Sequence, residues 1–381
     1  MSLIANWSYP TSIRFGAGRI VEIADACKTI GITKPLLVTD RGLAKLDITF
    51  KTLDLLYKAG LGRSIFSEVD SNPTEINAFA GIKMFIEGKH DGVIAFGGGS
   101  GIDLGKLVAF MIGQKRPIWD FEDIGNWWTR AETNKIMPII AIPTTAGTGS
   151  EVGRASVITN SQTKEKKIIF HPKFLPQIVI CDPELTVGMP SSITSGTGMD
   201  AFAHCLEAYC SPHYHPMSQG MALEGMRLVK DNLPIVYKDR NNITGRSHMM
   251  SAAIMGATAF QKGLGAIHAA SHPIGAVHNT HHGTTNAVVM REALLMNRSA
   301  IETKIELLCN YLDISGGFDG FISFVNNLNK VLNIPTSLTA MGVKEPNIKA
   351  LVQSALNDPS CSGNPIKLTK ENMTILFESC L

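Results

Sequence analysis

Short apolar runs alternate with amphipathic stretches through the first half of the chain. Four runs rich in β-branched and aliphatic residues predict buried strands: 34–40, 91–96, 136–144 and 177–182. Residues 50–60 and 73–89 repeat apolar positions at helical spacing, which predicts helices between the first two strands. Because strand and helix alternate, we expect a parallel sheet covered by helices. A β-hairpin is predicted over 156–170.

The pattern changes after Pro183. From about residue 191 onward, apolar residues recur every three or four positions, as in 220–230 and 301–312, which predicts helices. A chain of 381 residues also exceeds what one hydrophobic core usually supports. We therefore expect an α/β domain over 1–187 with a Rossmann-like parallel sheet, followed by an all-helical domain over 188–381.

Composition excludes several classes of partner. The net charge is only +2 and the charged residues, 18% of the chain, are of mixed sign, so we expect no nucleic-acid partner. No apolar run is long enough to span a membrane, and the first ten residues lack the pattern of a secretion signal. Seven dispersed cysteines without a C-x-x-C pair indicate reduced thiols. We expect a soluble cytoplasmic protein.

A glycine-rich turn follows the strand predicted at 91–96. Residues 97–103, Gly-Gly-Gly-Ser-Gly-Ile-Asp, lead into a helix, and backbone N–H groups bared by glycine at a helix N-terminus bind phosphate. The spacing departs from the P-loop and from the standard dinucleotide fingerprint, which argues against ATP. The same glycines also suit a turn that is merely sharp. Its place at the carboxyl end of a parallel strand favours a ligand.

Two further segments suit a nucleotide at the same edge of the sheet. Residues 143–151 supply hydroxyl groups and glycines without bulk, including Thr144, Thr145 and Thr148. Asp40 ends the first predicted strand, where a carboxylate accepts from ribose hydroxyls and repels a 2′-phosphate. NAD is therefore favoured over NADP. Each segment also fits a simpler role, as a polar loop or as the start of a turn.

Histidines gather in one short segment. Five of the eleven lie within residues 268–282: His268, His272, His278, His281 and His282. Upstream, Asp200 and His204 are four residues apart, which places them on one face of a predicted helix. One carboxylate and several imidazoles can enclose a divalent cation, and this mixture suits Fe²⁺ or Zn²⁺ better than Ca²⁺ or Mg²⁺.

Not every histidine of this segment is needed for a cation. Four protein ligands would nearly fill a tetrahedron, so we expect His278 and His281 to be wall or surface residues. We also expect Pro273 to interrupt the helix that carries His268 and His272.

Taken together, these motifs resemble those of the iron-containing (group III) alcohol dehydrogenases. Four segments carry most of the resemblance: GGGSGIDLGK at 97–106, PTTAGTGSEV at 143–152, MDAFAHCLEAY at 199–209 and GAIHAASHPIGAVHNTHHG at 265–283. The resemblance implies that the domain over 1–187 binds the dinucleotide and that the helical domain over 188–381 binds the metal. It also implies that metal and nicotinamide meet in the cleft between the domains.

The resemblance further implies roles for individual residues. The implied metal ligands are Asp200, His204, His268 and His282, with His272 as a nearby active-site imidazole. The implied cofactor contacts, together with Gly97 of the glycine-rich turn, are Asp40, Gly98, Gly99, Ser100, Asp103, Thr144, Thr145, Thr148 and Lys166. Lys167 is the alternative to Lys166, because the register of the hairpin is open by one residue.

We therefore expect a metal-dependent oxidoreductase that transfers a hydride between NAD(H) and a small alcohol, aldehyde or ketone, with His272 relaying the proton. A homodimer or larger assembly is expected. An alternative is a reductase of a carboxylate-bearing semialdehyde or hydroxy acid, with Lys262 pairing the carboxylate. A cyclising enzyme related to dehydroquinate synthases lacks matching basic residues. A non-enzymatic metal or nucleotide sensor is the remaining alternative.

Overall fold

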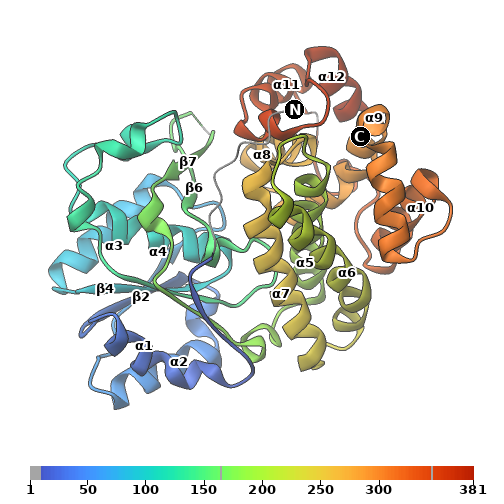
Figure 1. Cartoon of the computed structure of the whole chain (residues 1–381). Coiled ribbons are helices and arrows are strands. Elements are labelled where there is room, and N and C mark those ends of the chain that lie inside the picture. Colours follow the sequence, from blue (N-terminus) through green and yellow to red (C-terminus); the bar gives the residue numbers. More distant parts are fainter. Residues whose placement is uncertain (1–9, 164, 345) are drawn as a thin grey trace. The chain divides into compact units, whose positions relative to one another are not determined.

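A computed structural model describes residues 10–163, 165–344 and 346–381 (Figure 1). The chain forms two compact units. One unit contains the described chain up to Thr145 together with 149–187, and the other contains 146–148 and 188–381. The first is built on a parallel sheet and the second is helical. The predicted fold class is confirmed.

Six parallel strands form the sheet of the first unit. They are β1 (Ser12–Phe15), β2 (Pro35–Asp40), β3 (Ile65–Val69), β4 (Gly92–Gly97), β5 (Ile139–Pro143) and β8 (Ile178–Cys181). Their order across the sheet is β1-β8-β5-β4-β2-β3, and every neighbouring pair is parallel. The four strands that the sequence predicted are all present, with bounds shifted by a few residues.

The sequence analysis missed β1 and β3, which are the two edges of the sheet. Both are short, and most of their residues are partly or fully exposed. Central strands of a parallel sheet are buried on both faces and therefore form continuous apolar runs, as β4 and β5 do. An edge strand carries no such run, so the pattern that identified the central strands could not identify these two.

Helices cover both faces of the sheet. They are α1 (Ile23–Thr29), α2 (Asp47–Lys58), α3 (Glu75–Glu87) and α4 (Gly99–Met111). Figure 1 shows α1 and α2 on one face and α3 and α4 on the other. Helix α4 packs directly on β4 and β2. This close packing requires Gly105, because a Cβ there would lie 2.7 Å from the Cβ of Ala95.

The strand order reverses between β2 and β4. From β2 the chain proceeds outward to β3, then returns to the other side of β2 to form β4 and continues to β5. Ligands of open α/β sheets bind beyond the carboxyl ends of the strands at such a reversal. The reversal therefore brings Asp40, at the end of β2, beside the glycine-rich turn that follows β4.

The predicted hairpin is also confirmed. Strands β6 (Ala155–Thr159) and β7 (Lys166–Phe170) pair antiparallel as a separate two-stranded sheet. Lys166 pairs with Thr159 and Lys167 with Ile158. Because successive side chains of a strand point to opposite faces, the two lysines lie on different faces of the hairpin.

The second unit is formed by eight α-helices within the described residues. They are α5 (Ser191–Cys210), α6 (Pro216–Lys238), α7 (Ile243–Ala259), α8 (Ala266–His278), α9 (His282–Leu312), α10 (Gly317–Val331), α11 (Ile348–Leu356) and α12 (Lys370–Ser379). Helix α5 packs against α6, α7 and α9, and seventeen of its twenty residues are buried. Its polar side chains therefore depend on partners from neighbouring helices.

Small residues allow α5 and α9 to approach closely. A Cβ at Gly283 would overlap the backbone carbonyl of Gly196 and would lie 2.9 Å from the Cβ of Asp200. Neither helix could hold a larger residue at this crossing without moving apart. Because Gly283 directly follows His282, the crossing brings that histidine toward Asp200.

One expectation about the helices was wrong. Helix α8 does not stop near Pro273 but continues through it to His278. Proline is compatible with helical φ, and it removes one N–H donor rather than every bond of the turn. The buried side chains of Ile274 and the preceding alanines hold the helix in the core, so packing outweighs the lost hydrogen bond.

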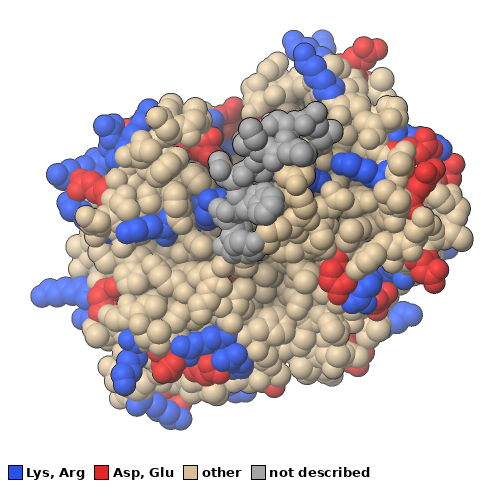
Figure 2. Space-filling view, in the orientation of Figure 1, with Lys and Arg blue, Asp and Glu red and all other residues tan. Residues whose placement is uncertain are grey.

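The surface and the helix lengths add two observations. No helix among the described residues is both long and apolar enough to cross a membrane. On the face shown in Figure 2, basic and acidic side chains are interspersed.

Candidate metal centre and cofactor loop

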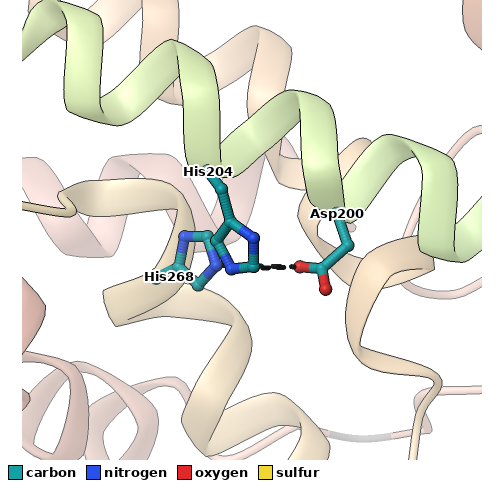
Figure 3. A group of neighbouring side chains, drawn as sticks. All are labelled: Asp200, His204 and His268. Atoms are coloured by element: carbon teal, nitrogen blue, oxygen red, sulfur yellow. Dashed lines mark ion pairs between the residues drawn. The ribbon is translucent and has the colours of Figure 1, made fainter. Parts of the chain in front are cut away.

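Two buried polar side chains lie one turn apart on α5. Asp200 is 2% exposed and His204 is 5% exposed. The Nε2 atom of His204 lies 3.6 Å from Oδ1 of Asp200. Figure 3 shows both side chains pointing from α5 toward His268 of α8. The spacing of four residues thus places them on one helix face, as the sequence indicated.

Two further imidazoles approach the same carboxylate oxygen. Nε2 of His268 lies 3.8 Å from Asp200 Oδ1, and Nε2 of His282, the first residue of α9, lies 3.5 Å from it. The rings of His204 and His268 stack with centroids 4.8 Å apart. Three helices therefore bring three imidazole nitrogens around one carboxylate oxygen.

The separations of 3.5–3.8 Å from Asp200 Oδ1 are close to those of a tetrahedral cation site. Ligand atoms about 2.0–2.2 Å from a metal are about 3.3–3.6 Å apart at the corners of a tetrahedron. The ligand atoms of Asp200, His204 and His268 all lie within 4.8 Å of one another. One hard carboxylate oxygen with imidazole nitrogens is also the donor set that suits Fe²⁺ or Zn²⁺. The residues present therefore fit a divalent cation.

The electrostatics of the cluster keep its carboxylate charged and one imidazole neutral. Burial by itself raises the pKa of a carboxyl, but His204, His282 and His268 hold the pKa of Asp200 well below its usual range. Burial lowers the pKa of His204 to about 4, so its ring is neutral at pH 7. An ionised carboxylate and a neutral imidazole are the forms in which these side chains bind metals.

Glu207, which the sequence analysis did not single out, lies behind His268. Its Oε2 accepts a hydrogen bond of 2.5 Å from Nδ1 of His268, and its Oε1 accepts one of 2.7 Å from the backbone N–H of Ile267. A carboxylate in this place holds the proton on Nδ1, so Nε2 is the nitrogen that can bind a cation. Burial alone would lower the pKa of His268, but Glu207 and Asp200 raise it to about 9, so a cation that binds Nε2 displaces a proton from it.

The sequence did contain a clue to Glu207. It follows His204 by three residues and Asp200 by seven, so helical spacing places all three on one face of α5.

His272 lies beside this cluster and has a partner of its own. Its ring stacks on that of His282 with centroids 5.2 Å apart. Its Nδ1 donates a hydrogen bond of 2.7 Å to Oδ2 of Asp358, which precedes the short helix Pro359–Gly363. Burial raises the pKa of Asp358, but His272 lowers it to about 2. Asp358 is thus ionised near neutral pH and fixes which nitrogen of His272 carries the proton.

His281 and His278 lie at the ends of helices. Nδ1 of His281 accepts a hydrogen bond of 3.3 Å from the backbone N–H of Thr284 and caps the N-terminus of α9. His278 is the last residue of α8 and precedes Asn279, which has a left-handed φ of 53°. The structure therefore gives His281 a role at the start of helix α9.

Lys262, the residue considered as a carboxylate partner, is 3% exposed. Its Nζ donates a hydrogen bond of 3.0 Å to the carbonyl of Tyr209 in the last turn of α5. Burial and the neighbouring Lys304 lower its pKa to about 8. Lys304 donates to the same turn, at 3.1 Å to the carbonyl of Cys210. Both ammonium groups thus satisfy carbonyls that the end of α5 leaves without helical partners.

In the first unit, the glycine-rich turn passes directly from β4 into α4. Gly97 has φ of 144°, a conformation that favours glycine, and Gly98 is the N-cap of α4. The first N–H groups of α4, from Gly99 and Ser100, have no carbonyl within the helix to bind. This is the arrangement that suits a phosphate group.

The threonines and Asp103 differ in their surroundings. The backbone N–H of Thr144 donates to the carbonyl of Gly97 at 2.9 Å, and the side chain of Thr145 lies beside Gly98. Asp103 is engaged internally: its carboxylate forms an ion pair of 3.0 Å with Lys106 and accepts from the backbone N–H of Val157 at 3.0 Å. These bonds join α4 to the hairpin. Thr148 belongs to the helical unit.

Asp40 and the hairpin lysines complete the set of predicted cofactor residues. Oδ1 of Asp40 accepts from the backbone N–H groups of Gly42 and Leu43, at 2.8 and 2.9 Å. Lys167 forms ion pairs with Glu122 and Glu165, whereas Lys166 lies on the other face of the hairpin.

Comparison with known proteins identifies the family. Residues 10–183 match the model described as iron-containing alcohol dehydrogenase, and residues 194–381 match the Fe-containing alcohol dehydrogenase family, C-terminal. The chain is 36% identical to a 4-hydroxybutyrate dehydrogenase from Cupriavidus necator, over 98% of this chain and 99% of that protein. The chain belongs to the iron-containing alcohol dehydrogenase family. Its predicted membership is confirmed.

Solved structures of this family are similar over the full length. A 1,3-propanediol oxidoreductase has a TM-score of 0.93 at 32% identity, covering 99% of this chain and 100% of that chain. A sulfoacetaldehyde reductase from Bifidobacterium kashiwanohense in complex with NAD+ has a TM-score of 0.90 at 27% identity, covering 100% and 99%. This member of the iron-containing alcohol dehydrogenase family is an NAD-dependent oxidoreductase of alcohols and aldehydes, in a family that also implies a metal ion.

Substitutions of the adjacent residues His281 and His282 test whether the cluster around Asp200 binds a metal. We expect His282→Ala to lower bound metal well below one ion per chain, because one of the nitrogens around Asp200 is lost. His281→Ala is the matched control: it should retain the metal and lose about 1 kcal/mol of stability with the helix cap. Elemental analysis and thermal unfolding measure the two effects. Equal metal content in both variants would contradict the cluster as a ligand set.

Proposed function

We propose that Asp200, His204, His268 and His282 together hold one divalent cation, Fe²⁺ or alternatively Zn²⁺. The observation that carries this proposal is the buried carboxylate oxygen of Asp200 with three imidazole nitrogens 3.5–3.8 Å away. A buried charge of this kind is costly unless it is paired or bound to a metal. On this proposal, residues 188–381 form the metal-binding domain.

We propose further that residues 1–187 bind NAD. The backbone of Gly97, Gly98, Gly99 and Ser100 would hold its pyrophosphate, and Asp40 would accept from the adenosine ribose. Thr144, Thr145 and Thr148 would lie along the cofactor, and Lys166 would approach the nicotinamide ribose. Support comes from the reversal of strand order between β2 and β4 and from the helix N-terminus at Gly99. Asp103 would act by holding the turn to the hairpin.

The reaction is hydride transfer between NAD(H) and a small alcohol, aldehyde or ketone. When bound, the cation polarises the substrate oxygen and the nicotinamide gives or accepts the hydride. Asp200 is the single carboxylate of the proposed ligand set, so it neutralises only part of a divalent charge. The imidazoles add no negative charge. Net positive charge therefore remains where the substrate oxygen gains electron density. A homodimer or larger assembly and a cytoplasmic location stay predictions.

His272 is proposed to move the proton of the alcohol. Its Nδ1–H is held by Asp358, which leaves Nε2 as the nitrogen that can accept and release a proton. Its ring lies against His282 without being one of the four proposed ligands. Asp358 acts through His272 and is a positioning residue.

The proposed activity can be tested by following NADH absorbance with protein that has been stripped of metal and reloaded separately with Fe²⁺ and Zn²⁺. We expect NADH oxidation with short aldehydes to require the metal, because substrate polarisation is lost without it. Matched protein without added metal is the control. Tight metal binding without turnover of any aldehyde or ketone tested would contradict the dehydrogenase proposal.

The proton relay predicts a pattern among variants. We expect His272→Ala to lower kcat by about 10²-fold, the usual order for loss of an acid–base group, with metal content unchanged. Asp358→Asn should lower kcat less and change its pH profile. The double variant should be no slower than His272→Ala, because both residues act through one proton. Loss of metal in His272→Ala, or additive losses in the double variant, would contradict the relay.

A second candidate function is reduction of a small carbonyl that carries an anionic group at its other end. Two relatives favour it: one is named for 4-hydroxybutyrate and another for sulfoacetaldehyde. In this case Lys262 would pair the substrate anion. Its Nζ donates to Tyr209 and has two further N–H groups.

Substitutions of Lys262 and Lys304, which both donate to the end of α5, distinguish binding of the substrate anion from a structural role. If Lys262 pairs the anion, Lys262→Met should raise KM for succinic semialdehyde at least about tenfold, which corresponds to the loss of one charge-assisted hydrogen bond. KM for an uncharged aldehyde should not change. Lys304→Met is the control, because Lys304 also donates to the carbonyl of Tyr209, at 3.4 Å. If both variants only lose stability, the role of Lys262 is to stabilise the end of α5. Lys262 would then not bind the substrate anion.

A further inference from the structure

Asn286 contacts the proposed metal ligands without being one of them. It follows His282 by four residues on α9, so helical spacing places the two on one face. It is fully buried. Its Oδ1 has no hydrogen-bond partner among the described residues. A buried amide with an unsatisfied oxygen is costly, so packing alone does not account for asparagine at this position.

The amide nitrogen of Asn286 faces three of the four proposed ligand atoms. Nδ2 donates a hydrogen bond of 2.8 Å to Oδ1 of Asp200. The same nitrogen lies 3.3 Å from Nε2 of His282 and 3.4 Å from Nε2 of His268. One side chain thus contacts ligands from α5, α8 and α9.

The orientation of this amide is determined by its neighbours. An ionised carboxylate only accepts hydrogen bonds, so the side of Asn286 that faces Asp200 must be the NH₂ group. The outer nitrogens of the two imidazoles have partners of their own. Nδ1 of His268 bonds to Glu207, and Nδ1 of His282 lies 3.5 Å from Ser271 Oγ. The Nε2 atoms of both rings therefore face the region beside Asp200 and the Asn286 amide.

We propose that Asn286 is a positioning residue of the metal centre, which restrains the Asp200 carboxylate in the orientation that binds the cation. This inference rests on the proposed ligand set. Glu207 orients His268 through Nδ1, and Asn286 orients Asp200 through Oδ1.

The test replaces the amide with an apolar group of the same shape. Asn286→Leu should weaken Zn²⁺ binding by about tenfold, the order found when groups that orient metal ligands are removed. The visible absorption of the Co²⁺-loaded protein should also change, because that spectrum reports the geometry of the ligands. The unfolding midpoint of the metal-stripped protein should fall, because the buried Asp200 carboxylate loses a donor. Asn286→Ala is a second variant with the same expectation for metal binding, in case leucine is not accommodated.

Asn329 provides the matched control. Its Nδ2 donates to the carbonyl of Ala287, next to Asn286 on α9, and its Oδ1 is likewise buried without a partner among the described residues. Asn329→Leu should leave Zn²⁺ affinity and the Co²⁺ spectrum unchanged. An Asn286→Leu protein with wild-type affinity and spectrum would overturn the inference, as would a loss of affinity matched in Asn329→Leu. Failure of the proposed function is distinguishable, because the wild-type protein itself would then bind no cation.

Discussion

The buried carboxylate of Asp200 is the constraint on which the helical unit depends. A charge that is 2% exposed must be compensated by its surroundings. Three imidazole nitrogens and one amide N–H converge on its Oδ1 from α8, α9 and α5 itself. The compensation therefore comes from side chains on three different helices, and the positions of those helices are linked through one oxygen atom.

The packing of the helices follows from this convergence. Gly283 and Gly196 allow α9 to cross α5 closely enough for His282 to reach Asp200. Glu207 joins α5 to the first turn of α8 through the N–H of Ile267 and through His268. The segment at 358–364 contributes twice more, since Asp358 holds His272 and Asn364 accepts from the backbone N–H of Ala266. The chemical groups of the site are thus also the contacts that assemble the helices.

The sequence predicted the parts of this account that follow from local spacing. Continuous apolar runs identified the central strands, and the four-residue spacing placed Asp200 and His204 on one face of α5. Edge strands β1 and β3 were missed because half-exposed strands carry no such run. Pro273 was misjudged because burial of its helix outweighs one lost hydrogen bond.

Partners that depend on tertiary structure were harder to foresee. Glu207 and Asn286 share helical spacing with proposed ligands, so a search for polar residues on the same face could have found both. Asp358 could not be found in this way, because 86 residues separate it from His272 and only the fold brings them together. The hydrogen bonds that occupy Lys262 and Asp103 likewise depend on contacts that spacing does not reveal.

The most direct test of the account is X-ray absorption at the metal edge of Zn²⁺-reloaded protein. The account predicts a shell of nitrogen and oxygen atoms at about 2.0–2.1 Å, with the outer scattering of three imidazoles. A shell of six oxygens, or scattering without imidazole, would show that the cation is not held around Asp200 by these histidines.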